Sequence, residues 1–203
     1  MIDIEIRRAI DPSLDRLGRS LASTGLTANS VTWLGFAGGM TAGILVIWEQ
    51  YWLALLFIVL NRLADGLDGA MARRSQATDV GGFLDIVLDL IFYSWIPLCF
   101  AIANPMNALP AAFLIHSFAG TGGSFLTFAV ISAKRGITSD KENKKSFFYS
   151  RGLMEGTETV VFLIAICLLP TQFPLFAWVY GALCWLTTAL RIGIAMRSFA
   201  AVP

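Results

Sequence analysis

Five aspartates lie close together in a chain that has only 14 acidic residues. They are Asp65, Asp68, Asp79, Asp85 and Asp89. Asp65 and Asp68 are three residues apart and Asp85 and Asp89 are four apart, so each pair shares one face if its segment is helical. A carboxylate inside a membrane-spanning helix costs roughly 2.5–3.5 kcal/mol on insertion scales, which makes these acids functional candidates.

The two pairs are predicted to face each other across a helical hairpin. Only a short connection, from Arg74 to Asp79, separates the two segments. At a rise of 1.5 Å per residue, Asp65 lies about 13 Å from Arg74 and Asp85 about 9 Å from Asp79. Carboxylates that converge at one depth stay ionised only when cations neutralise them. Oxygen ligands without nearby His or Cys favour Mg²⁺, Mn²⁺ or Ca²⁺, and four acids suffice to bridge two ions for phosphoryl displacement.

The alternative is a structural network of ion pairs between these acids and nearby arginines. The arginines are Arg62, Arg73 and Arg74. Three guanidinium groups cannot pair individually with four inward-facing carboxylates, and Arg74 is expected at the lipid head groups. We therefore favour a metal site.

The composition indicates which kind of protein must position these acids. Of 203 residues, 56% are hydrophobic and 14% charged, and the mean hydropathy is +0.68. A soluble domain has about 25% charged residues, so this composition excludes a soluble monomer, and its apolar content excludes a disordered chain. A net charge of +1 gives no reason to expect nucleic-acid binding. The expected fold class is an all-α polytopic membrane protein.

Six segments are long and apolar enough to cross a bilayer, which takes about 20 residues. The predicted spans are 30–48, 51–72, 80–103, 108–133, 153–170 and 174–195. The connections at 49–50, 104–107 and 171–173 contain no Lys or Arg, whereas the other connections and both chain ends are basic. The positive-inside rule therefore predicts a multi-pass protein of the cytoplasmic (inner) membrane, with both termini inside and the acids opening to the cytoplasmic side.

The chain is expected to form a single domain over residues 1–203. Residues 1–28 are predicted to form a cytoplasmic interfacial segment, because apolar residues recur there every three or four positions, as in an amphipathic helix. A disordered tail is the alternative. Residues 29–196 form the predicted six-helix bundle, in which Gly35, Gly39 and Gly43 have a spacing typical of close helix packing.

The acids are part of a longer pattern of fixed residues. It reads Asp65-x2-Asp68-Gly69-x2-Ala72-Arg73-x7-Gly81-x3-Asp85-x3-Asp89. This pattern resembles the signature of the CDP-alcohol phosphatidyltransferase family, and every fixed position of that signature is present. The six-helix outline after a cytoplasmic amphipathic helix also resembles the family, so the resemblance covers nearly the whole chain.

The resemblance implies an enzyme of phospholipid biosynthesis that transfers a phosphatidyl group. CDP-diacylglycerol would donate the group, the hydroxyl of a small alcohol would attack the lipid-side phosphate, and CMP would leave. Asp65, Asp68, Asp85 and Asp89 would hold two Mg²⁺ or Mn²⁺ ions, and Asp85 and Asp89 would be catalytic, with Asp89 as general base. A homodimer is also implied.

The same resemblance implies contacts with the donor nucleotide. Gly69 and Arg73 would contact the nucleotide or its diphosphate, and Asp68 would help to hold it. Asn29 and Thr32 match a short Asn-x2-Thr stretch of the family and would line the cytidine pocket. A helix-capping role explains Asn29 equally well.

The connection between the fourth and fifth spans contains the candidate acceptor-binding residues. Lys134, Arg135 or Arg151 would bind a phosphorylated alcohol such as glycerol 3-phosphate or inositol phosphate, whereas Glu155 and Glu158 would bind an ammonium group or polyol hydroxyls. Cytoplasmic topology and anionic lipids also explain the basic residues, and a place in the first turn of a helix explains the glutamates. The acceptor therefore stays open.

Two other functions share some of these features. An intramembrane prenyltransferase also uses Asp-rich motifs and Mg²⁺, but there the motifs lie far apart in a longer chain. A divalent-cation transporter is expected to show internal repeats and broken helices near the midplane. This sequence shows no repeat, and its acids cluster towards one side.

Overall fold

The computed structural model describes residues 14–18, 20, 23, 25–73, 78–136, 154 and 156–200. These residues form helices and no strand. The long helices are α2 (Ala28–Ile47), α3 (Tyr51–Ala72), α4 (Asp79–Ala103), α5 (Ala108–Lys134), α7 (Gly156–Leu168) and α8 (Phe173–Ala200). Two short 3-10 turns, η1 (Pro105–Asn107) and η2 (Pro170–Gln172), join α4 to α5 and α7 to α8.

Local sequence explains where α2 and α4 begin. The hydroxyl of Thr27 accepts a hydrogen bond from the Ser30 N–H at 3.2 Å, and the hydroxyl of Thr78 accepts one from the Gly81 N–H at 3.1 Å. Each satisfies a backbone donor that has no partner within its own helix. Asp79, in the first turn of α4, also places negative charge at the positive end of the helix dipole. The helix that carries Asp85 and Asp89 therefore starts at a well-defined residue.

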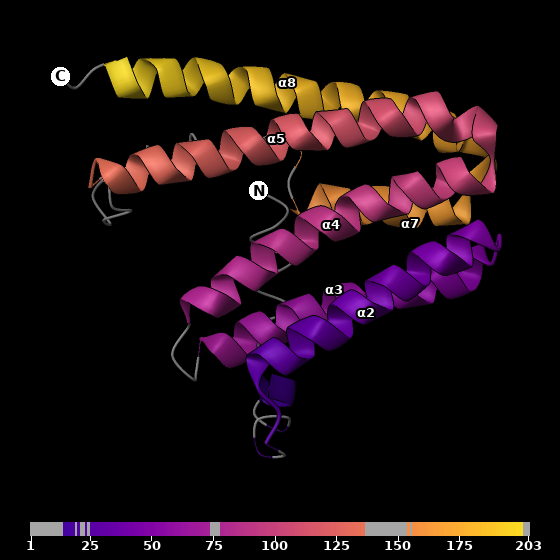
Figure 1. Cartoon of the computed structure of the whole chain (residues 1–203), viewed down its shortest axis with the longest axis horizontal. Helices are drawn as coiled ribbons and strands as arrows, with labels where there is room; N and C mark the ends of the chain where they lie inside the picture. The colour runs from indigo at the N-terminus through magenta and orange to yellow at the C-terminus, as the bar shows by residue number, and fades with distance from the viewer. Residues whose placement is uncertain are drawn as a thin grey trace.

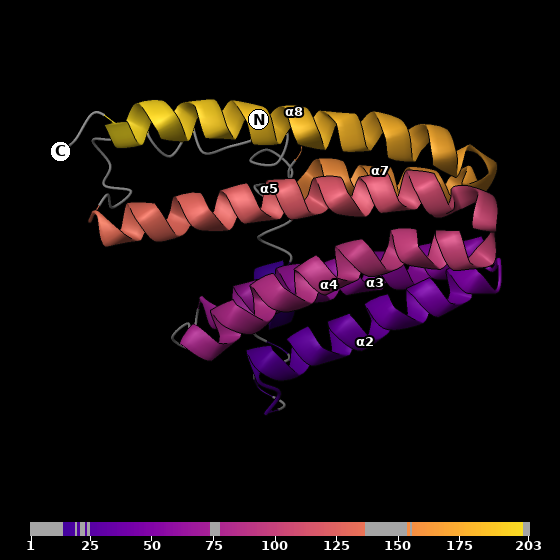
Figure 2. The ribbon, with the colours of Figure 1, turned by 45° about the horizontal axis from the view of Figure 1, so that its top comes forward.

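The helices are joined at one end of the molecule and spread apart towards the other. The connections between α2 and α3, α4 and α5, and α7 and α8 all lie at the right-hand end (Figure 1, Figure 2). α2 packs on α3 and α4, α5 packs along α8 and contacts α4, and α7 packs on α3. The three connections at this end are the ones that contain no Lys or Arg.

The apolar core fills the joined half of the bundle. Phe92, Ile96 and Phe100 are fully or almost fully buried in the second half of α4, and the ring of Phe100 stacks on Phe173 with centroids 4.4 Å apart. Of the described residues, the buried charged side chains of Asp68 and Arg191 lie in the opposite halves of their helices. The core therefore holds the helices at one end and leaves polar groups to face each other towards the other end.

Glycines allow α2 to lie directly against α4. A Cβ atom on Gly39 would lie 2.6 Å from Phe92, and a Cβ atom on Gly43 would lie 2.0 Å from Nε1 of Trp95. Because these side chains are absent, Trp95 Nε1 donates a hydrogen bond to the Met40 carbonyl at 3.1 Å. The close packing predicted from the glycine spacing is confirmed.

The membrane class and the all-helical fold are confirmed, whereas the number of spans is confirmed only in part. Four helical segments are long and apolar enough to cross a membrane: α2, α4, η1 with α5, and η2 with α8. The 22-residue α3 carries Arg62, Asp65 and Asp68, and α7 has 13 residues. α8 extends to Ala200, beyond the predicted 195, because the helix continues past the apolar window.

Most of the predicted interfacial segment lies outside the described residues. Residues 14–18 are helical and lie over the last turns of α3. The side chain of Leu14 occupies the space above Gly66, where a Cβ atom would lie 2.9 Å away, and Asp15 Oδ1 is 3.8 Å from a guanidinium nitrogen of Arg73. The division into residues 1–28 and 29–196 and the homodimer stay predictions.

Replacing Gly43 by Leu is expected to destabilise the protein by about 1–3 kcal/mol, because the new side chain must displace Trp95 and Cys99 from the contact with α2. The measurement is the melting temperature in detergent, followed by size-exclusion chromatography after heating. Gly193→Leu is the matched control, since a Cβ atom there meets nothing within 4 Å. Equal melting temperatures for the two variants would contradict the close packing of α2 and α4.

Candidate active site

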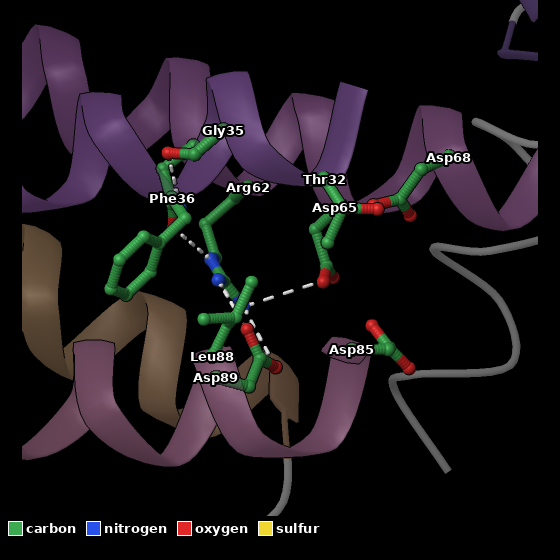
Figure 3. A pocket seen from close by; sticks show the side chains of 10 residues that line it. Thr32, Gly35, Phe36, Arg62, Asp65, Asp68, Asp85, Leu88 and Asp89 are labelled. Atoms are coloured by element: carbon green, nitrogen blue, oxygen red, sulfur yellow. Dashed lines mark hydrogen bonds and ion pairs between the residues drawn. The ribbon is translucent and has the colours of Figure 1, made fainter. Parts of the chain in front are cut away.

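Four aspartates from two helices point into the space between α3 and α4 (Figure 3). Asp65 and Asp68 come from α3, and Asp85 and Asp89 come from α4. They line a small cavity of about 20 Å³. The other residues of its lining are Thr32, Gly35, Phe36, Asn61, Arg62 and Leu88. The predicted convergence of the two pairs is therefore observed.

Three of the carboxylates form a compact trio. Asp65, Asp68 and Asp85 each place one oxygen within 4.8 Å of the others, and their side chains range from buried at Asp68 to exposed at Asp85. Oδ2 of Asp68 is buried and has no hydrogen-bond partner among the described residues. An unsatisfied buried oxygen costs free energy, which a cation at this position would offset. The trio therefore fits Mg²⁺ or Mn²⁺, which prefer carboxylate oxygens.

Asp89 lies beside the trio and is held by Arg62. Nη2 of Arg62 donates a hydrogen bond to Oδ1 of Asp89 at 2.7 Å, and Nη1 donates one to Oδ2 at 3.3 Å. Nη1 is also 3.7 Å from Oδ2 of Asp65. Such a two-pronged pair is short and directional. It joins α3 to α4 at one edge of the trio.

Neighbouring side chains fix the position of the Arg62 guanidinium. Its Nε donates to Oδ1 of Asn61 at 2.8 Å, and its Nη1 donates to the Tyr93 hydroxyl at 2.7 Å. The group lies over the ring of Phe92, 4.7 Å from the centroid. Asn61 is itself held by a 2.8 Å hydrogen bond to the carbonyl of Gly35 on α2. Only 11% of the Arg62 side chain is exposed, so three helices together determine where it lies.

The predicted nucleotide-binding residues lie at the other edge of the trio or beside it. Thr32 and Asp68 line the cavity. Oδ1 of Asn29 lies against α4, 3.1 Å from where a Cβ atom on Gly81 would be. The N-cap of α2 is Thr27. The helix-capping explanation of Asn29 is therefore wrong, and its side chain bridges α2 and α4.

Gly69 and Arg73 lie one and two turns beyond Asp65, outside the lining of the cavity. A Cβ atom on Gly69 would be 3.6 Å from Nη1 of Arg73, so the arginine folds back over this glycine. The Arg73 side chain is 55% exposed and approaches Asp15. Arg73 therefore places a guanidinium group near the end of α3, on the side of the site that the sequence predicts to face the cytoplasm.

The candidate acceptor-binding residues are described only in part. Nη1 of Arg135 donates a 2.8 Å hydrogen bond to the carbonyl of Phe199, and the guanidinium lies 5.3 Å from the centroid of the Phe199 ring. Lys134 is in the last turn of α5, and Glu158 is in the first turn of α7. Arg151 and Glu155 lie outside the described residues. The contacts of Arg135 join the end of α5 to the end of α8.

Sequence reasoning considered Arg62 only as part of an ion-pair network and missed its supporting residues. The pairing is realised for Asp89 and, more loosely, for Asp65. Tyr93 is four residues after Asp89 and Asn61 is four before Asp65, so their places on the same helix faces were the available signal.

Solved structures with a similar fold include a phospholipid synthase of known identity. The Mycobacterium tuberculosis phosphatidylinositol phosphate synthase PgsA1 with CDP-DAG bound has a TM-score of 0.66 and 20% sequence identity, over 90% of this chain and 93% of that one. The same protein in complex with manganese and citrate has a TM-score of 0.65 and 20% identity, over 90% and 88% of the two chains. At this identity the likeness shows the shared fold.

Sequence comparison adds relatives and a family. The inner membrane protein YnjF of Escherichia coli strain K12 is 47% identical over 193 residues, which are 95% of this chain and 94% of that protein. Archaetidylinositol phosphate synthase of Pyrococcus horikoshii is 35% identical over 86 residues, 42% of this chain and 46% of that one. The family model of the CDP-alcohol phosphatidyltransferases matches residues 9–193. This chain therefore belongs to the CDP-alcohol phosphatidyltransferase family.

Proposed function

We propose that this enzyme transfers a phosphatidyl group from CDP-diacylglycerol to the hydroxyl of a small phosphorylated alcohol and releases CMP, in a reaction that requires Mg²⁺ or Mn²⁺. The observation that carries the proposal is the trio of Asp65, Asp68 and Asp85, with its unsatisfied buried oxygen, on the signature hairpin of the family. A similar fold binds CDP-DAG in one structure and manganese in another, which supports this donor and this class of metal.

The chemistry assigns a separate task to each part of the site. When bound, a divalent ion supplies positive charge to the diphosphate and to the departing CMP. Asp65, Asp68 and Asp85 would hold that ion, and Asp89 would receive the proton of the acceptor hydroxyl. The hydroxyl oxygen forms a bond to the lipid-side phosphorus as the bond from this phosphorus to the CMP oxygen breaks. Asp85, as a ligand of the ion, and Asp89, as the acceptor of the proton, are the proposed catalytic residues.

The donor nucleotide is proposed to lie at the Asn29 side of the trio. Thr32 and Asp68 line the cavity there, and Asn29 contacts the first turn of α4 beside it. Gly69 leaves room above α3, and the exposed guanidinium of Arg73 is suited to a phosphate. The donor would then be bound by residues from α2, α3 and α4 together.

The acceptor is proposed to bear a phosphate of its own. Two proteins similar to this chain are named as synthases of inositol phosphate lipids. The segment from Lys134 to Gly152 also contains six of the 15 basic residues of the chain. Lys134, Arg135 or Arg151 would bind the phosphate, and Glu155 or Glu158 would bind hydroxyls.

Six spans with both termini in the cytoplasm are proposed as the topology. α3 and α7 would add two spans to the four apolar ones: α3 runs beside α2 from the joined end, and the 13-residue α7 runs from the same end over part of the length of the bundle (Figure 1). The connections at the joined end contain no Lys or Arg, which favours the outer side of the membrane for that end. The trio then opens to the cytoplasm, the side from which the polar head group of a CDP-linked lipid would reach it.

Replacing Asp65, Asp68 or Asp85 by Asn is expected to lower metal-dependent CMP release from CDP-diacylglycerol by more than about 100-fold, since the loss of even an outer partner of a metal ligand costs 10–100-fold. The assay measures CMP from purified protein with Mn²⁺ or Mg²⁺. Asp79→Asn is the control, because Asp79 is exposed outside the cavity in the same hairpin, and it should retain activity close to that of the wild type. Release that survives all three substitutions would refute the proposed site.

An acceptor panel tests the second half of the reaction. With labelled CDP-diacylglycerol, inositol phosphate or glycerol 3-phosphate should give labelled lipid at a higher kcat/KM than inositol or glycerol, because a phosphate adds charge-assisted hydrogen bonds to a basic site. Thin-layer chromatography separates the products. A preference for the unphosphorylated member of both pairs would contradict a phosphorylated acceptor.

Cysteine labelling in intact cells tests the topology. Met106→Cys, at an 82% exposed position in η1, should react with a membrane-impermeant maleimide from outside. Asp79→Cys, at the opposite end of α4, should react only after the membrane is opened. The native Cys99, Cys167 and Cys184 are buried and give little background. The reverse pattern would show that the orientation is wrong.

A further inference from the structure

We propose that this chain binds one divalent ion in its acidic pocket, and that the guanidinium group of Arg62 takes the place of a second ion. The inference rests on the proposed function, because it concerns the ion held by Asp65, Asp68 and Asp85. It differs from the sequence prediction of two ions shared by four aspartates.

The first support is the position of the charge. Asp89 directs both carboxylate oxygens towards Arg62, at 2.7 Å and 3.3 Å, and Asp65 directs one oxygen towards the same group at 3.7 Å (Figure 3). An ion shared by Asp65 and Asp89 would have to lie between these two carboxylates. A guanidinium nitrogen already lies there and carries positive charge.

The second support is that Arg62 cannot easily withdraw. Asn61, Tyr93 and the ring of Phe92 all contact its guanidinium, and its side chain is 11% exposed. If the Arg62 guanidinium moved, it would need new partners, and so would the side chains of Asn61 and Tyr93. Such partners are few in a membrane-embedded bundle, where water is scarce. Arg62 is therefore a built-in part of the pocket.

The third support is the division of the carboxylates. Asp65, Asp68 and Asp85 gather their oxygens within 4.8 Å of one another, and Asp89 does not join them. The pocket thus offers one set of three oxygens to an ion and one carboxylate to an arginine.

The consequence for the reaction is a positioning role for Arg62. Its two hydrogen bonds orient Asp89 without removing every lone pair of that carboxylate. Asp89 can therefore still accept a hydrogen bond from the acceptor hydroxyl while the trio holds the ion. In this arrangement Arg62 supplies fixed positive charge on the acceptor side of the pocket.

Counting bound Mn²⁺ tests the proposal. Purified wild-type protein in detergent is dialysed to equilibrium with Mn²⁺, and bound metal per chain is measured by atomic absorption and by electron paramagnetic resonance. We expect one ion per chain, with the spectrum of an isolated Mn²⁺ ion. Arg62→Lys keeps the charge and should still bind one ion. Arg62→Met removes the charge and should bind two ions, with the magnetic coupling of neighbouring Mn²⁺ ions.

Arg191→Met is the matched control. Arg191 is also a buried arginine, 5% exposed, but it lies in α8, where its Nη1 donates to the Thr121 carbonyl at 2.8 Å and to the Ser124 hydroxyl at 3.0 Å. Its removal should leave the count at one ion. This variant separates the loss of a charge beside Asp89 from the loss of any buried arginine.

Each result decides the question. Two coupled ions in the wild type, or one ion in folded Arg62→Met, would overturn the substitution of Arg62 for an ion. If Arg62→Met does not fold, as judged by size-exclusion chromatography, the counts for wild type and Arg62→Lys still decide. A wild-type protein that binds two ions and releases CMP only with metal would overturn this inference alone. A protein that binds no ion and releases CMP without metal would overturn the proposed function as well.

Discussion

The site depends on the balance of charge among carboxylates that the fold forces together. Four acids meet between α3 and α4 in a bundle with an apolar exterior. Their mutual repulsion is screened less there than it would be in bulk water. The cross-helix pair of Arg62 and Asp89 settles part of this charge and also joins the two helices. Breaking a buried pair of this kind by removing one partner typically costs about 3–5 kcal/mol, because the other charge stays behind. The remaining trio keeps an excess of negative charge, which a bound cation would neutralise in the proposed reaction.

The rest of the bundle keeps this arrangement rigid. Stacked rings and branched side chains fill the joined half, so α3 and α4 diverge from a fixed end. Glycines on α2 allow its backbone to approach both helices, and the Gly35 carbonyl then holds Asn61, which in turn holds Arg62. A chain of contacts therefore runs from a packing motif on α2 to the carboxylate of Asp89 on α4. The small residues of the first span act on the site through this chain, although they bear no reactive group.

Much of this could be predicted from the sequence because it follows from periodicity. Residues three or four apart share a helix face, which placed Asp65 with Asp68 and Asp85 with Asp89, and the same rule predicted the glycine contact. The partner of Arg62 could not be predicted in this way. Local spacing favours its neighbour Asp65 on α3, whereas the closer partner is Asp89 on α4. That choice depends on Tyr93 and Asn61, which meet only in the folded bundle. Asn29 was ambiguous for the same reason, since only the contact with α4 distinguishes bridging from capping.

The two edges of the trio differ in exposure and in the groups that line them. Arg62, Asn61 and Tyr93 close the edge next to Asp89, whereas Asp85 is exposed at the other edge. Asn29, Gly81 and Arg73 lie towards this exposed edge, in the part of the hairpin where α3 ends and α4 begins. The charged diphosphate of the proposed donor would approach from this edge, because desolvation is smallest where the trio is open. In the proposed reaction, the trio would separate the nucleotide side of the attacked phosphorus from its acceptor side, as displacement with entry opposite to departure requires.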